Sequence, residues 1–310
     1  MDNLKASLNQ LMEERNWNEK YRTLISKALN DPDVVAFLEE HKDRLSNKDI
    51  IASSSNIYEF VQEKRKIENG GKSLAPGFYP KLLINKNTID VTYVPTQDTR
   101  KKLKEEEVNN RIKLHHLPKD IADVRLDDVD FTENRQAIVV ELFKFIDDYS
   151  SKPKQLHQGV YLHGPFGVGK TFLMGALARE LALLGVQTQM YHFPTFVFEV
   201  KQAIGDNTIS EKVQPLRESP VLVIDDIGAE SLSAWIRDDI LGVILQYRMQ
   251  EQLPTFFTSN KSMAELETHL ATSQKGDEEP LKAKRIMERV KYLAHPIELS
   301  GQNRRHEGDY

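Results

Sequence analysis

Cysteine is absent from this sequence of 310 residues, and so is any long run of apolar residues. Without cysteine there can be no disulfide bonds and no zinc or iron–sulfur centres with cysteine ligands, which fits a reducing compartment. No stretch approaches the roughly 18 uninterrupted apolar residues of a membrane-spanning helix. The first residues, MDNLKASLNQLMEERN, contain no apolar core of a secretory signal. We therefore expect a cytoplasmic protein without a membrane partner.

An excess of basic charge is also missing, because 42 Lys and Arg face 47 Asp and Glu and the net charge is -5. This excludes a wholly basic coat for nucleic acid but allows a local basic groove. Hydrophobic residues make up 39% of the chain and charged residues 29%. That balance is typical of a globular protein, and the length predicts two domains.

The first 66 residues have the apolar spacing of helices. Their apolar stripes include Leu4, Leu8, Leu11, then Tyr21, Leu24, Ile25 and Leu29, and, in a helix expected over 48–67, Ile50, Ile51, Ile57, Phe60 and Val61. A break rich in Gly and Pro over 68–80 precedes a predicted β-hairpin over 81–94, which turns at Asn85-Lys86-Asn87. Residues 100–116 are dominated by charge and predict a solvated helix or linker. We expect an N-terminal domain of residues 1–100, a charged linker over 101–120 and a second domain over 121–310.

Beyond residue 121 short apolar strands alternate with helices. The expected strands are residues 160–163, 187–192, 221–224, 255–258 and 296–299, and the expected helices are 133–149, 170–184, 194–204, 231–250, 262–270 and 281–293. Such alternation predicts an α/β domain in which helices cover both faces of a parallel sheet.

One segment matches the phosphate-loop pattern G-x-x-x-x-G-K-[ST] in full, and a predicted strand precedes it while a predicted helix follows it. Its residues are Gly164, Pro165, Phe166, Gly167, Val168, Gly169, Lys170 and Thr171. Glycines allow backbone N–H groups to approach phosphate oxygens, and the helix N-terminus favours negative charge. Lys170 can reach the β- and γ-phosphates and the Thr171 hydroxyl can bind Mg²⁺. The alternative is a Gly-rich turn that only connects strand to helix.

Polar residues follow two of the expected strands, at the edge where open α/β sheets bind ligands. Asp225 and Asp226 end the apolar run VLVI, and Asn260 follows PTFFTS. Asp225 is predicted to hold Mg²⁺, directly or through water, and Asp226 to act as general base on the attacking water. Asn260 is predicted to contact the γ-phosphate or the water. The alternatives are acids that cap the next helix and an Asn in an ordinary turn.

Arginines form two further groups. Arg285 and Arg289 lie four apart on an expected helix, hence on one face, and Arg304 and Arg305 follow the last expected strand. Arginines near a γ-phosphate stabilise the charge that develops there, from the same subunit or from a neighbour. The residues alone favour solvated cations. The segment 201–217 is a candidate DNA contact, with a solvated helical turn as the alternative.

The chain resembles the bacterial replicative helicase loaders, the DnaC/DnaI-like branch of the AAA+ ATPases. The stretches that carry the resemblance are GVYLHGPFGVGKTFLMGALARELA, PVLVIDDIGAESLSAWIRDDILGVILQYRM, LPTFFTSN, KAKRIMERVKYLAHPIEL, GQNRRH and, near the N-terminus, DPDVVAFLEEHKDRL and GFYPKLLINKNTIDVTY. They cover nearly the whole chain. The resemblance implies ATP-regulated loading of a hexameric replicative helicase onto single-stranded DNA, as a primosome component in initiation or restart of replication.

The resemblance also implies roles for single residues. The segment 164–171 matches the Walker A loop, and Asp225 and Asp226 match the Walker B acids. Asn260 matches the sensor-1 residue. ATP and Mg²⁺ are the implied cofactors.

Arg289 matches the arginine finger that completes a neighbour's site, and Arg285 is its companion. Arg304 is assigned to the sensor-2 position, with Arg305 left open as the alternative. The N-terminal domain is implied to contact the helicase, and the C-terminal domain to bind ATP and single-stranded DNA and to self-associate or assemble on the helicase ring.

The sequence departs from the family pattern at two places. The better-known DnaI-type members of the family carry an N-terminal zinc site whose Cys residues precede a G-x-H-P-K-L run, whereas this chain has EKRKIENGGKSLAPGFYPKL with Tyr79 in place of the His. Zinc needs thiolate or imidazole ligands, so we expect none. Asp226 stands where many AAA+ proteins have Glu, and this shorter carboxylate predicts slow, switch-like hydrolysis.

Two other functions share parts of the pattern. A transposition-helper ATPase of the related branch would have the same C-terminal motifs, although GFYPKLLINKNTIDVTY argues against it. A binding module that holds nucleotide without turnover would have the same phosphate loop.

Overall fold

The computed structural model describes residues 19–129, 133–153, 155–205, 208–272, 276 and 278–304. The chain divides into two compact units, residues 1–104 and residues 105–310, which are described separately below. The apolar stripe at Leu4, Leu8 and Leu11 lies outside the described residues. No helix of the described ranges is long and apolar enough to cross a membrane.

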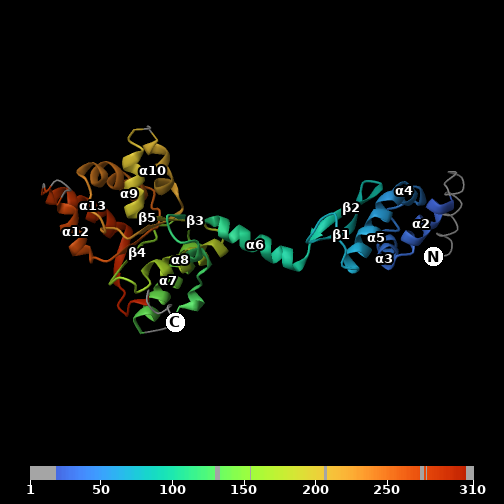
Figure 1. The fold of residues 1–310 in the computed structure, drawn as a ribbon, viewed down its shortest axis with the longest axis horizontal. Helices are drawn as coiled ribbons and strands as arrows, with labels where there is room; N and C mark the ends of the chain where they lie inside the picture. The colour runs from blue at the N-terminus through green and yellow to red at the C-terminus, as the bar shows by residue number, and fades with distance from the viewer. Residues whose placement is uncertain are drawn as a thin grey trace. The chain divides into compact units, whose positions relative to one another are not determined.

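The first unit consists of short helices packed on a β-hairpin (Figure 1). Its elements are α2 (Glu19–Leu29), α3 (Pro32–Glu40), α4 (Asn47–Ala52), α5 (Ser54–Glu68), β1 (Phe78–Asn85) and β2 (Thr88–Pro95). Ile25, Ile57 and Ile89 are fully buried where these elements meet. Helices and hairpin therefore share one core, as the apolar stripes predict.

The helix expected over 48–67 is two helices that meet at Ser53. The Ser53 hydroxyl donates to the carbonyl of Asp49 at 2.8 Å and accepts the backbone N–H of Ile89 at 2.8 Å. A side chain bonded to both the preceding turn and the hairpin favours a bend at this point. The hairpin turns at the predicted residues, and within the turn Lys86 has a positive φ, of 56°.

Two buried charged residues of α5, Glu63 and Lys64, stabilise the first unit outside its apolar core. Glu63, 2% exposed, accepts the backbone N–H of Leu74 at 2.9 Å and pairs with Lys66. The N–H bond is the main reason why the pKa of Glu63 is lowered. Lys64 pairs with Asp31 at 2.8 Å and Asp33 at 2.6 Å. The loop after α5 and the start of α3 are thus fixed by carboxylates.

The second unit is a six-stranded parallel sheet in the order β3-β5-β6-β7-β4-β8. Its strands are β3 (Ile112–His115), β4 (Gly159–His163), β5 (Thr188–His192), β6 (Val221–Asp225), β7 (Thr255–Ser259) and β8 (Ala294–Glu298). Because all strands run in one direction, their carboxyl ends meet at one edge. β8 lies at one side of the sheet and contains Pro296.

Helices cover both faces of this sheet, which confirms the predicted fold class. α7 (Glu133–Ser151) and α8 (Lys170–Leu183) belong to the core on one face. The other face is covered by α9 (Phe193–Gln202), α10 (Ile209–Glu218), η3 (Ile236–Leu241), α11 (Gly242–Gln250), α12 (Met263–Ala271) and α13 (Pro280–Leu293). Figure 1 shows α7 and α8 on one side of the sheet and α9 and α13 on the other.

The charged segment contains the solvated helix that its charge pattern predicts, and also a strand and two short 3-10 helices that the pattern does not predict. α6 (Gln97–Arg111) leads into β3, and η1 (Lys119–Asp123) and η2 (Leu126–Asp128) follow. Val108 and Ile112 are buried in the core beneath α8. Leu114, Leu117 and Ile121 pack against the same core, so apolar residues without a clear periodicity dock this charged segment.

Candidate functional site

The phosphate loop joins β4 to α8, and its glycines adopt backbone angles that other residues rarely take. φ is 152° at Gly164, 75° at Gly167 and 90° at Gly169. A Cβ on Gly164 would collide with the carbonyl of Leu299, and one on Gly167 would overlap the side chain of Asn303. Only glycine therefore fits at these positions. The resulting loop at the start of α8 is of the kind that binds phosphate.

The non-glycine residues of the phosphate loop differ in burial. Val168 is fully buried, whereas Phe166 is 62% exposed and Pro165 is also exposed. Arg135 of α7, 3% exposed, donates to the carbonyl of Val168. α7 thus supports the loop from behind, which sequence reasoning missed because Arg135 lies about 30 residues before the loop with no motif around it.

Lys170 is buried and bonded within the loop. Its Nζ donates to the carbonyls of Gly164 and Pro165 at 2.8 Å each and to Asn260 Oδ1 at 2.7 Å. The ammonium group therefore lies among three oxygens in the place where phosphate oxygens are expected. A bound nucleotide has to replace part of this set.

Asp225 lies at the end of β6 between two hydroxyl groups. Thr171 Oγ1 and Thr258 Oγ1 donate to its Oδ1 at 2.8 and 2.7 Å. Asp225 is 3% exposed. Burial raises the pKa of its carboxyl, while the hydroxyl donors act in the opposite direction. Its Oδ2 receives no hydrogen bond from the described residues.

Asp226 and Asn260 are brought together by the next strand, β7. Asp226 has a φ of 60°, and its backbone N–H donates to Thr258 Oγ1 at 2.9 Å. Asn260 Nδ2 donates to Asp226 Oδ1 at 3.0 Å. A left-handed residue other than glycine is uncommon and requires support from its surroundings. Here Thr258 supports the backbone, and the Asn260 side chain links the Asp226 carboxylate to Lys170.

These groups line a cleft of about 530 Å³ at the carboxyl edge of the sheet. Its other end is less polar and is formed by His116, Leu117, Pro118, Ile121 and Phe172. An apolar end joined to a phosphate loop is suited to a nucleobase. Sequence reasoning missed this end because it placed residues 116–120 in a linker. The adjacent Leu and Pro in a charged segment were the available signal.

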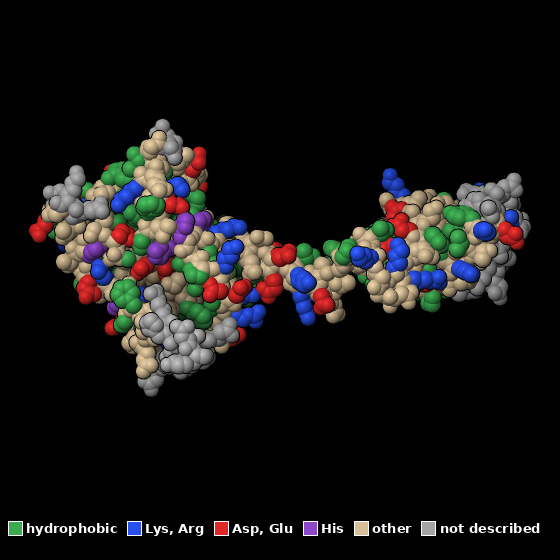
Figure 2. All heavy atoms as spheres, viewed as in Figure 1, with side chains coloured by type: hydrophobic (Ala, Val, Ile, Leu, Met, Phe, Trp, Pro, Cys, Tyr) green, Lys and Arg blue, Asp and Glu red, His purple; other side chains and the backbone are tan. Residues whose placement is uncertain are grey.

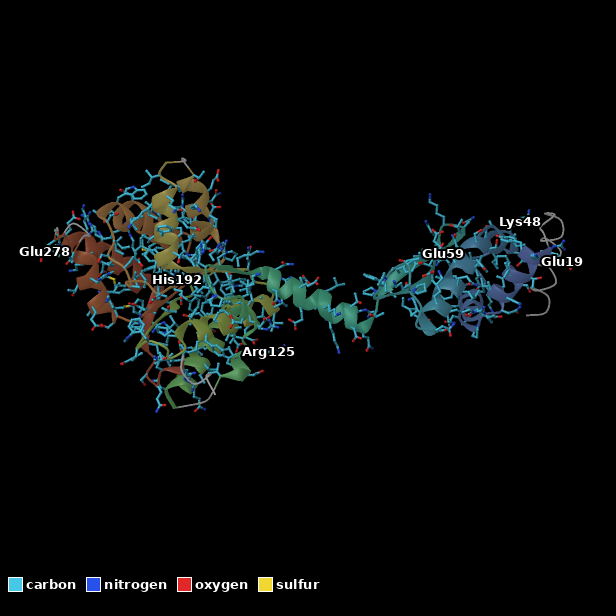
Figure 3. All side chains as sticks on the ribbon, viewed as in Figure 1. Glu19, Lys48, Glu59, Arg125, His192 and Glu278 are labelled. Carbon is cyan, nitrogen blue, oxygen red and sulfur yellow. The ribbon has the colours of Figure 1, made fainter. Side chains whose placement is uncertain are left out.

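Histidines gather beside this end of the cleft. His116, with a φ of 61°, contacts Glu199 of α9 at 2.7 Å. His192, labelled in Figure 3, ends β5 and also lines the cleft. Figure 2 shows His side chains on the face where Figure 1 labels β3 and β5. Within the described residues no group of three or more His, Asp or Glu is arranged to hold a metal by itself.

The predicted arginines lie at two places. Arg304 lines the cleft, and its backbone N–H donates to the carbonyl of Gly167 at 3.0 Å. Arg305 lies outside the described residues. Arg289 does not reach the cleft of its own chain: it lines a separate hollow, where its Nη1 donates to the carbonyl of Gly242 at 2.8 Å. Arg285 is exposed.

Comparison with known proteins places both units in known families. The family described as "Primosomal protein DnaI N-terminus" matches residues 1–93. The family described as "IstB-like ATP binding protein" matches residues 99–308. The replicative helicase loader DnaI of Bacillus subtilis (strain 168) is 36% identical over 99% of this chain and 100% of its own.

Solved structures agree with this assignment. A crystal structure of DnaI is 42% identical, covers 64% of this chain and 100% of its own, and has a TM-score of 0.54. A proposed primosome component of Streptococcus pyogenes serotype M3 is 42% identical over 64% of this chain and 98% of its own, with a TM-score of 0.52.

Proposed function

The chain belongs to the DnaI family of replicative helicase loaders, and we propose that it loads the replicative DNA helicase onto single-stranded DNA under the control of ATP. The control by ATP is supported by one observation: Lys170, Asp225 and Asn260 line the same cleft. Three segments far apart in sequence supply these groups. Such an arrangement binds and polarises a triphosphate.

We propose that ATP occupies the full length of the cleft. The base would occupy the apolar end beside Leu117 and Phe172, and the phosphates would lie over the loop 164–171. Lys170 would exchange the carbonyls of Gly164 and Pro165 for β- and γ-phosphate oxygens, which form stronger charge-assisted bonds. Arg304, adjacent to the loop through its backbone bond to Gly167, would face the phosphates from the other side.

Mg²⁺ is proposed as cofactor on the chemistry of the donors. Thr171 supplies a hydroxyl oxygen and Asp225 a carboxylate, which are the hard ligands that Mg²⁺ prefers. Both hydroxyl donors of Asp225 bond its Oδ1, so its Oδ2 has no hydrogen-bond donor within the described residues. When bound, the ion would neutralise charge on the phosphate oxygens.

Asp226 is the proposed general base, and Asn260 the residue that holds it. The Asn260 amide fixes one carboxylate oxygen at 3.0 Å. The carboxylate would accept the proton of the attacking water. We propose that hydrolysis is slow because the Asp side chain is one methylene shorter than Glu. Faster phosphate release by Asp226→Glu would support this account.

Partners are proposed for each unit. Residues 1–100 would bind the hexameric helicase, and α6 would join them to the ATPase unit, whose sheet includes β3. That unit would bind single-stranded DNA, for which residues 201–217 are the candidate segment, and would associate with further copies so that Arg289 reaches a neighbour's nucleotide. A cytoplasmic location follows from this role.

A loading assay tests the function directly. The chain is mixed with the replicative helicase and circular single-stranded DNA coated with single-strand binding protein, and unwinding of an annealed strand is measured. We expect stimulation that requires ATP and is lost in Lys170→Ala. A chain that leaves unwinding unchanged but activates a transposase would favour the transposition-helper alternative. Normal loading without any phosphate release would favour the static binding module.

A further inference from the structure

A second cationic hollow lies away from the nucleotide cleft. It has a volume of about 260 Å³ and is lined by residues of α10, α11 and α13 together with Asp238, among them Arg217, Tyr247 and Arg289. No residue lines both this hollow and the cleft. Two arginines from helices that are far apart in sequence therefore line one small hollow.

The chain's own nucleotide cannot reach this hollow. Arg217 lies four residues before β6, and Arg289 lies in the last turns of α13, directly before β8. Both positions are at the amino ends of parallel strands, whereas the cleft is at their carboxyl ends. Five residues of strand span about 16 Å. Whatever anion enters the hollow has to come from another molecule.

The charge of the hollow is not neutralised by the protein. Neither Arg217 nor Arg289 has a carboxylate within 4.0 Å among the described residues. Asp238, the one acid in the lining, pairs with Arg237 at 2.7 Å and with Lys282 at 3.2 Å. Partial burial and the nearby charge of Arg285 lower the pKa of Arg289. The two arginines are thus available to a ligand of negative charge.

Both guanidinium groups are held in place. Arg217 lies over the ring of Tyr247, 4.5 Å from its centroid, and its Nε is buried without an acceptor among the described residues. The buried Arg248 donates to the carbonyl of Arg217 at 3.2 Å and so fixes its backbone. Arg289 approaches the backbone of Gly242 so closely that a Cβ there would lie 3.1 Å from its Nη1. Such preorganisation is typical of groups that stabilise charge in a reaction.

We propose that Arg217 acts together with Arg289 as a second trans-acting arginine, which contacts the terminal phosphate of ATP bound to a neighbouring copy of this chain. This rests on the proposed assembly of the ATPase unit. A nucleic-acid strand is the less suitable ligand, because strand binding requires a row of cations along a groove, and this hollow is a single compact space with two.

The experiment measures ATP hydrolysis by the full chain over a range of protein concentrations, with assembly followed by sedimentation. For Arg217→Gln we expect about a tenfold or greater loss of kcat, smaller than the loss known for other trans arginines, with ATP affinity within about twofold of wild type. Arg217→Lys, which keeps a charge over the ring, should recover part of the rate. Lys144→Ala, a change of an exposed cation on α7, is the matched control.

Mixing shows which copy supplies the arginine. Arg217→Gln with Lys170→Ala should be more active than either alone, because an intact loop then meets an intact Arg217 across an interface. Loss of kcat without recovery in the mixture would overturn the proposal. So would a rate per molecule that does not depend on concentration, or a loss of single-stranded DNA affinity with kcat unchanged.

The variant Arg289→Gln distinguishes the proposed role of Arg217 from the proposed assembly on which it rests. If Arg289→Gln is impaired while Arg217→Gln equals wild type, Arg217 only packs on Tyr247 and the arginine-finger assignment stands. If both equal wild type in assembled protein, the trans site itself is wrong. If Arg217→Gln has a lowered melting temperature, Arg217→Lys, which keeps the positive charge, replaces it in the experiment. A mixture of Arg217→Lys and Lys170→Ala that is no more active than either variant alone would then overturn the proposal.

Discussion

Lys170 is the residue on which nucleotide affinity depends most directly. Its Nζ donates hydrogen bonds to the carbonyls of Gly164 and Pro165 and to Asn260 Oδ1, and phosphate oxygens would replace some of these acceptors. Charge-assisted bonds contribute about 1.5–3 kcal/mol each, so Lys170→Ala should weaken ATP binding by about 100-fold. Titration with a fluorescent ATP analogue measures this. Lys152→Ala, at an exposed position, is the control, and equal affinity of both variants would contradict the phosphate-loop assignment.

Glu230 gives the protein a pH-dependent stability. Both its carboxylate oxygens are buried without a partner among the described residues. Burial first, and the charge of Asp226 second, raise the pKa of its carboxyl to about 7. The folded state therefore holds this proton over a range, from about 4.5 to about 7, in which the unfolded chain has lost it. Stability must fall as the pH rises through that range.

Glu230→Gln should accordingly raise the melting temperature at pH 8 and have little effect near pH 5. Thermal denaturation at the two pH values, with Glu251→Gln at an exposed position as the control, tests this. If Glu230→Gln changes the melting temperature by the same amount at both pH values, the pKa of Glu230 is not raised in the folded state.

Among the elements, η3 depends on one buried arginine. Arg237, 2% exposed in its side chain, donates to the carbonyl of Leu270 at 3.1 Å and pairs with Asp238 and Glu279. It thereby joins η3 to the end of α12 and the start of α13. Arg237→Met removes the donor of the Leu270 carbonyl and leaves Asp238 and Glu279 with Lys282 as their remaining partner, so it should cost about 2 kcal/mol of unfolding free energy.

The same change should lower ATP turnover, because α13 carries Arg289. Denaturant titration and phosphate release measure the two effects, with Lys284→Met on the exposed side of α13 as the control. Full stability of Arg237→Met would mean that these three helices are held by apolar packing alone. Lost stability with full turnover would separate α13 from catalysis.

The elements also show how far sequence reasoning reaches. Contiguous signals such as the run VLVID and the phosphate loop predict β6 and the start of α8, because neighbouring residues act together there. The division at Ser53 depends on a bond to Ile89, 36 residues away, and no local pattern contains it. The hollow at Arg217 likewise requires three helices to meet. Features assembled from distant residues need the fold before they can be recognised.

At the scale of the whole molecule, the two compact units should be separable. Residues 1–104 and 105–310 each have an apolar core of their own. Expressed separately, each should give a cooperative thermal transition. Only the second should bind ATP, with the affinity of the full chain, and only the first should be retained on immobilised helicase.

Calorimetry, nucleotide titration and helicase capture test these expectations, with the full chain as reference. Failure of residues 105–310 to bind ATP would show that the first unit contributes to the cleft. Helicase capture by residues 105–310 alone would reassign the binding surface.

The proline of β8 restricts how copies of this chain can associate. A sheet with an open side strand can grow by adding a strand from another molecule, which is a route to fibrous aggregates. β8 forms one side of the sheet, and Pro296 has no N–H to offer an incoming strand. An incoming strand would therefore lose a backbone hydrogen bond in the middle of this side. Contacts between copies here would depend more on side chains, whose contacts ligands can make and break.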